Sequence, residues 1–154
     1  MSLDDDIAFF EQVPLLAQLG DEALRILAIG AENQRVPHGA VLFYAGDLAD
    51  GGFVIQQGSF LLEPDTPRQG ESVTVGPGAL LGELALLTDT VHTFTATAVS
   101  SANVIRIPRS LFLKMLEGYP AAAVQLRDAM AQRIERFTQD MTALKAVFDP
   151  DRSA

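Results

Sequence analysis

Glycine and proline interrupt the middle of the chain so often that this pattern, more than any other, limits the possible folds. Between residues 37 and 82 one or the other recurs every few positions. The runs between and after them are short and of β-type composition: Val41–Tyr44, Phe53–Gln56, Ser59–Glu63, Ser72–Val75, Phe94–Val99 and Asn103–Ile107. Many short strands at this spacing predict a mainly β fold, either a sandwich or a jelly-roll barrel, over residues 31–107.

Helical periodicity precedes this region. Residues 4–29 place apolar side chains at helical spacing, with a break at Pro14 and a new start at Gly20-Asp21. Gly30 then supplies a stop signal. The pattern predicts N-terminal helices over residues 1–30.

A second helical region follows the strands, over residues 108–148. Ser110 is a suitable N-cap for a helix over Leu111–Glu117, and Gly118 is a suitable end. Pro120 then starts a longer helix that we expect to reach about Phe148.

The apolar residues of this longer helix form a regular seam. They recur at spacings of four, three, four, three and four: Met130, Ile134, Phe137, Met141, Leu144 and Phe148. We expect Leu126 and Met130 to pack on the barrel. Beyond Phe137 the helix should extend past so small a barrel, and an a/d seam then favours a partner helix over packing on the barrel. The interpretation is a parallel homodimer through residues 121–148.

Composition narrows the classes of protein. A chain of 154 residues with 48% hydrophobic residues is expected to form one domain, over residues 1–154. Eleven Lys and Arg against 20 Asp and Glu give a net charge of −9, which disfavours unaided DNA or RNA binding. The chain has no cysteine, which excludes disulfides, thiolate nucleophiles and Cys-ligated metal sites. It also has no apolar run of membrane-spanning length, and its N-terminus is acidic where a signal peptide would be basic. The last two features predict a soluble cytoplasmic protein without membrane contact.

The stretch over residues 76–83 has the features of a ligand-binding site. A Gly-Pro-Gly turn at 76–78 leads to Gly82 and Glu83, in a segment that is otherwise apolar. Glycines at such a turn allow backbone N–H groups to point at an anion. A carboxylate there needs partners, and sugar hydroxyl groups are suitable ones. The alternative is a strand-to-helix corner whose glutamate only caps exposed N–H groups.

The segment Leu81-Gly82-Glu83-Leu84-Ala85-Leu86-Leu87 resembles the phosphate-binding cassette of cyclic nucleotide-binding domains, the family of catabolite activator and cAMP-dependent kinase regulatory proteins. Three further stretches resemble the family in order and spacing: residues 37–47, 49–58 and 104–112. The resemblance covers roughly residues 8–138. It implies an eight-stranded antiparallel jelly-roll barrel flanked by N-terminal helices and a long C-terminal helix.

The resemblance also implies roles for residues of the cassette. Gly82 and Ala85 match positions whose backbone N–H groups bind the cyclic phosphate, with Leu84 between them in the motif. Glu83 matches the carboxylate that accepts a hydrogen bond from the ribose 2′-hydroxyl. The implied ligand is cAMP or cGMP, with no other cofactor and no metal.

The cassette departs from the family at one position. Nine residues after the glutamate the family usually has an arginine that pairs with the phosphate, whereas this chain has His92. Histidine offers one donor per nitrogen and is mostly neutral near pH 7. The following Thr93 matches a small or hydroxyl position that can donate to the phosphate.

On the long helix the resemblance implies three further contacts. Arg133 matches a basic residue that reaches back toward the glutamate and the phosphate. Phe137 and Thr138 match the place where the helix meets the base. We therefore expect Glu83 and Arg133 to form an ion pair or a one-water bridge, at least when ligand binds.

The residues do not favour an enzyme. A metal site of cupin type needs clustered histidines, and the chain has only His38 and His92. No Gly-x-Ser-x-Gly motif supports a hydrolase. The sequence ends six residues after Phe148, too soon for the helix-turn-helix that the family's DNA-binding members append, so we expect no direct DNA binding and a separate, unknown output protein.

Two functional hypotheses remain. The first is a sensor that binds a cyclic nucleotide or a related anionic nucleotide and signals through its C-terminal helix. The second is a dimeric protein-interaction module with a degenerate pocket.

Overall fold

Three helices precede the strands in the computed structural model, which describes residues 3–66 and 70–129. They are α1 (Leu3–Glu11), α2 (Pro14–Ala17) and α3 (Asp21–Gly30). Pro14 occupies the first turn of α2, where its missing N–H has no cost. Asp21 and Glu22 stand in the first turn of α3, where carboxylates favour the helix dipole. The break and the stop predicted from the sequence are both confirmed.

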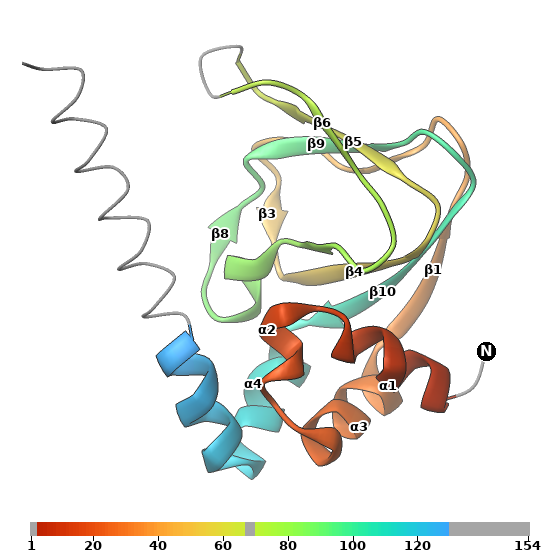
Figure 1. The fold of residues 1–154 in the computed structure, drawn as a ribbon. Helices are drawn as coiled ribbons and strands as arrows, with labels where there is room; N and C mark the ends of the chain where they lie inside the picture. The colour runs from red at the N-terminus through yellow and green to blue at the C-terminus, as the bar shows by residue number, and fades with distance from the viewer. Residues whose placement is uncertain (1–2, 67–69, 130–154) are drawn as a thin grey trace, which may run out of the picture.

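Eight strands form two four-stranded antiparallel sheets (Figure 1). The first, sheet A, has the order β1-β10-β4-β7, and the second, sheet B, has the order β2-β9-β5-β6. Sheet A consists of β1 (Glu32–Val36), β10 (Ala102–Pro108), β4 (Gly51–Gln57) and β7 (Leu80–Leu81), and sheet B of β2 (Val41–Phe43), β9 (Phe94–Ala98), β5 (Phe60–Pro64) and β6 (Val73–Val75). A separate two-stranded ladder joins β3 (Leu48–Ala49) to β8 (Thr90–Val91).

The predicted jelly roll with flanking helices is confirmed, with two differences. The sheets are open and do not close into a complete barrel. Four of the observed strands were not among the runs predicted from the sequence: β1, β3, β7 and β8.

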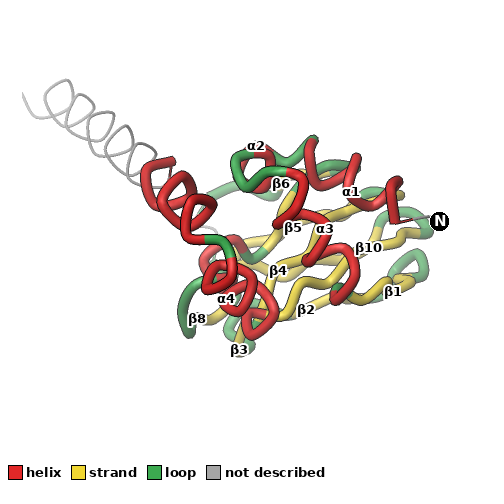
Figure 2. The backbone as a smooth tube through the Cα atoms, turned by 90° about the horizontal axis from the view of Figure 1, so that it is seen from below, coloured by secondary structure: helices red, strands yellow, loops and turns green. Residues whose placement is uncertain are grey.

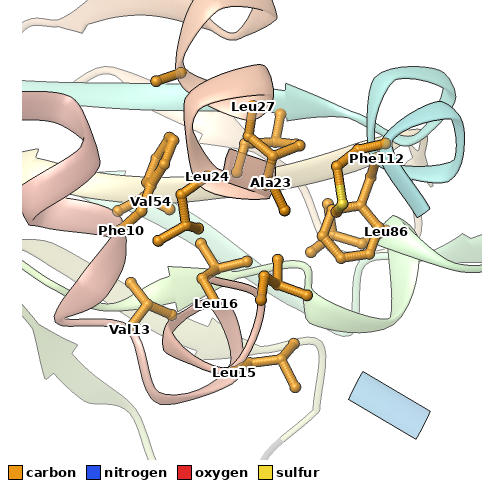
Figure 3. Close-up of a cluster of buried hydrophobic side chains, with 14 of the residues drawn as sticks. Phe10, Val13, Leu15, Leu16, Ala23, Leu24, Leu27, Val54, Leu86 and Phe112 are labelled. Carbon is orange, nitrogen blue, oxygen red and sulfur yellow. The ribbon is translucent and has the colours of Figure 1, made fainter. Parts of the chain in front are cut away.

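Two hydrophobic cores lie on opposite faces of β4. Val54 belongs to the core under the helices, whereas Phe53 and Ile55 belong to the core between the sheets. This follows from the alternation of side chains along a strand. Figure 2 shows α1, α3 and α4 in front of the strands, and Figure 3 shows the side chains of the helical core, including Phe10, Leu24 and Phe112.

The helix α4 (Arg109–Gly118) follows β10 directly, which corrects the predicted start. Its N-cap is Pro108 rather than Ser110, and no side chain caps it. A side-chain cap is not required for the first N–H, because the Arg109 backbone N–H already donates to the Asp50 carbonyl oxygen at 2.7 Å. The predicted end at Gly118 is confirmed.

Residues 120–129 are helical, as predicted from Pro120 onward. Leu126 is 2% exposed and belongs to the core under the helices, which also contains Val54 of β4 and Ile105 of β10, so it packs on the domain as predicted. The remainder of the predicted helix, with its seam from Met130 to Phe148, lies outside the described residues. Within residues 3–66 and 70–129, no helix is long and apolar enough to cross a membrane.

Candidate functional site

The glycine-rich segment forms a tight turn and then a short 3-10 helix. The turn closes with a hydrogen bond from the Ala79 N–H to the Gly76 carbonyl oxygen at 3.2 Å. After β7 the backbone reaches Gly82, which has φ 77° and ψ 37° and stands as N-cap of η2 (Glu83–Leu86). A Cβ atom at Gly82 would lie 2.9 Å from the Gly51 carbonyl oxygen. Only glycine combines this left-handed conformation with so close an approach.

The backbone of η2 uses one of the N–H groups that the resemblance assigns to phosphate. The Ala85 N–H donates to the Gly82 carbonyl oxygen at 3.1 Å. Both the Leu87 and Thr88 N–H groups donate to the Leu84 carbonyl oxygen, each at 3.1 Å. A phosphate contact at Ala85 would therefore compete with, or share, an existing hydrogen bond.

The side chains of η2 divide into anchors and surface groups. Ala85 and Leu86 are completely buried, and Leu86 belongs to the helical core. Leu84 is 60% exposed and Glu83 is half-buried. Ala85 and Leu86 thus attach the predicted cassette to the protein interior, whereas Glu83 lies at the boundary with solvent.

His92 lies against this cassette and is only 8% exposed. Its ring stacks on Phe43 with centroids 3.6 Å apart and planes 7° apart. Its Cε1 would be 3.6 Å from a Cβ atom built at Gly82. Phe53 and Phe94 lie around the same phenylalanine, each with its ring centroid 5.7 Å from that of Phe43.

Two opposing influences act on the pKa of His92. Burial lowers the pKa below its usual value of 6.5 by disfavouring the charged ring, while the negative charges of Asp47 and Asp50 act in the opposite direction. Burial is the larger influence, so the pKa of His92 is lowered and the neutral ring is favoured in the free protein.

The backbone of His92 fixes its place. Its N–H donates to the Asp47 carbonyl oxygen at 2.9 Å, and its carbonyl oxygen accepts from the Gly46 N–H at 2.7 Å. The loop after β2 therefore holds the segment that carries the imidazole.

The structure brings Gly82 and His92 together, with Glu83, Leu84 and Ala85 following Gly82 on η2. Thr93 follows His92, and its side chain is exposed. The other three predicted site residues, Arg133, Phe137 and Thr138, lie outside the described residues. The expected pairing of Glu83 with Arg133 remains a prediction.

Sequence reasoning missed Arg109, the first residue of α4. Its Nη1 donates to the carbonyl oxygens of Thr88 at 3.0 Å, Ala49 at 3.1 Å and Ala85 at 3.3 Å. Its Nη2 donates to the Asp89 carboxylate. These partners are 20 to 60 residues away in the sequence, so no local pattern indicated the cluster.

Comparison with known proteins agrees with this geometry. Residues 33–119 match the sequence model of the Cyclic nucleotide-binding domain family. The chain belongs to this family. The match confirms the resemblance stated above and covers the whole cassette.

Two solved structures extend the comparison. A cyclic nucleotide-binding-like protein from Brucella abortus is 41% identical, with a TM-score of 0.64, over 74% of this chain and 99% of that one. The N-terminal domain of a transcriptional regulator from Streptomyces coelicolor is 28% identical, with a TM-score of 0.78, over 86% and 94% of the two chains.

Longer proteins contain a related segment. An uncharacterized NTE family protein of Mycobacterium tuberculosis is 29% identical over 131 residues, which is 85% of this chain and 22% of that protein. The chain therefore spans about a fifth of the length of this curated relative.

Proposed function

We propose that this cyclic nucleotide-binding domain is a regulatory sensor. Its cassette, residues 82–93, binds cAMP, cGMP or a related anionic nucleotide, and the segment from residue 121 onward transmits the signal. The observation that carries the proposal is the left-handed Gly82 at the start of η2, with the His92 ring beside it. We assign no catalytic step to the domain.

Each cassette residue has a distinct task in this proposal. The first turn of η2 presents backbone N–H groups to the phosphate. Glu83, by its family match and its half-buried position, accepts from the ribose 2′-hydroxyl. His92 donates one N–H to the phosphate without a permanent charge, so binding is weaker than with arginine by about 1.5–3 kcal/mol, or one to two decades.

The surroundings of His92 support a second candidate function. The imidazole is buried against Phe43, and Phe94 lies near the same ring. If these rings occupy the ligand position, the domain is an interaction module that has lost its nucleotide. The two candidates differ in whether any nucleotide binds.

Calorimetric titration with cAMP and cGMP at low salt, at pH 7.5 and pH 6, separates them. We expect weak binding by the wild-type chain that strengthens at pH 6, because the phosphate stabilises the imidazolium. His92→Arg should increase affinity about 10–100-fold by restoring two charge-assisted contacts. Glu83→Ala should abolish ribose-dependent binding. Glu63→Ala, an exposed glutamate on β5, is the matched control and should change nothing.

Equal and negligible binding by the wild-type chain and the folded His92→Arg variant at both pH values would reject the sensor. That result would favour the interaction module. Circular dichroism of each variant shows whether it is folded, which matters because the new guanidinium must replace a buried ring.

A further inference from the structure

The guanidinium of Arg109 joins three parts of the fold that the sequence keeps far apart. It contacts Ala49 in β3, Ala85 in η2, and Thr88 and Asp89 in the turn that follows. The residue itself begins α4. One side chain therefore connects the ligand-binding cassette to the first helix after the sheets.

The donors and acceptors explain why an arginine stands here. Nη1 has two hydrogens and three carbonyl acceptors, so at least one hydrogen is shared between two of them. Nη2 reaches the Asp89 carboxylate at the same time. A lysine has three donors on a single nitrogen and cannot span this width.

The carbonyls that it binds lie at a helix end. Ala85 and Thr88 lie within and just after η2, where a helix leaves its last carbonyl oxygens without intrahelical donors. A positive charge at this end of a helix is also favourable. Arg109 thus fixes the far end of the cassette, while Gly82 sets its beginning.

The backbone of Arg109 adds a second connection. Its N–H donates to the Asp50 carbonyl oxygen at 2.7 Å, between β3 and β4. Any displacement of the start of α4 must therefore move or break contacts to both β3 and the cassette. The side chain is 21% exposed, so it is mostly shielded from competing water.

We propose that Arg109 is a positioning residue for the cassette: it fixes η2 in its binding geometry and makes that geometry depend on the position of α4. The positioning half stands on the contacts alone. The coupling of bound ligand to α4 rests on the proposed function.

Hydrogen exchange of the 154-residue chain without nucleotide tests the positioning role of Arg109. Arg109→Gln should raise the exchange rates of the cassette amides, such as Leu87 and Thr88, by about tenfold or more. Arg106→Gln is the matched control. Arg106 on β10 is 23% exposed and pairs with Asp50 and Glu32, but it makes none of these bonds to the cassette. Its removal should leave cassette exchange unchanged.

Two further variants sharpen the result. Asp89→Asn should have little effect, because Asp89 is 93% exposed and its ion pair is weak in water. Arg109→Lys keeps the positive charge but loses the planar guanidinium with its several donors. The exchange rates of its cassette amides should lie between those of the wild-type chain and those of Arg109→Gln. The lysine variant replaces the glutamine variant if that one does not fold.

Titration of the same variants tests the coupling. In the wild-type chain, added cAMP or cGMP should slow exchange in both the cassette and the first turn of α4. In Arg109→Gln, affinity should fall about tenfold or more, and protection should no longer reach α4. If the wild-type chain binds no nucleotide, the proposed function fails. The positioning role of Arg109 is then tested only by the hydrogen exchange of the cassette amides in the absence of nucleotide. Equal cassette exchange in the Arg109→Gln and Arg106→Gln variants would overturn that role.

Discussion

The burial of His92 against Phe43 affects how the stability of the fold responds to acid. Because burial lowers its pKa in the folded protein, the unfolded chain binds its proton more readily. The contribution of His92 to stability is therefore complete above pH 6.5. It is lost progressively as the pH falls through the lowered pKa.

We predict that the free energy of unfolding falls between pH 7.5 and pH 5, partly through His92. His92→Gln should flatten this part of the profile, measured by urea denaturation at each pH. His38→Gln is the matched control, because His38 is exposed and should leave the profile unchanged. Identical profiles for the wild-type chain and His92→Gln would contradict the assignment. Nucleotide affinity is predicted to change in the opposite direction over the same range.

The residues of the site were predictable to different degrees. Gly82 and Glu83 stand in one contiguous motif, so the sequence was enough to place them. The burial of His92 depends on a ring from β2, and the role of Arg109 depends on carbonyls from β3 and η2. Backbone carbonyls carry no sequence signal, so contacts of this kind become visible only once the chain is folded.

At the scale of elements, η2 is attached to the helical core through its apolar side chains, and Leu86 is the largest of them. Leu86 is completely buried in the helical core, whereas Leu84, two residues earlier, is 60% exposed. The cassette is therefore anchored to the core by Leu86.

Leu86→Ala should cost about 2–5 kcal/mol of unfolding free energy, because it removes a buried side chain and leaves a cavity. Leu84→Ala, in the same short helix, should change stability by less than about 0.5 kcal/mol. Chemical denaturation of the two variants measures the difference. Similar values for both would show that η2 does not depend on this anchor.

The strands were predicted from the sequence only in part. Six strands were predicted because their apolar and β-branched residues lie between turn signals. The strand β1 was missed because Glu32 to Arg35 are all exposed and show no apolar alternation. The strands β3, β7 and β8 have two residues each, too few for any period to appear.

At the scale of the whole molecule, oligomeric state remains a proposal. The seam from Met130 to Phe148 lies outside the described residues and rests on the heptad spacing alone. In a parallel dimer, the paired helices over residues 121–148 would connect the cassettes of the two copies.

Phe137→Glu and Leu144→Glu should produce monomers in sedimentation velocity, because each places a charge in the apolar seam. Gln139→Glu is the control on the opposite face of the predicted heptad and should leave the mass unchanged. A monomeric wild-type chain, or an unchanged mass for both seam variants, would contradict the dimer. It would indicate that the apolar seam packs within its own chain.

The two faces of β4 have a consequence for how the protein melts. Val54 completes the core under the helices, and Phe53 and Ile55 complete the core between the sheets. Neither core can lose this strand without exposing the other to water. The N-terminal helices and the sheets should therefore unfold in one cooperative transition. Deletion of residues 1–30 would expose to water the apolar face of the sheet that these helices cover.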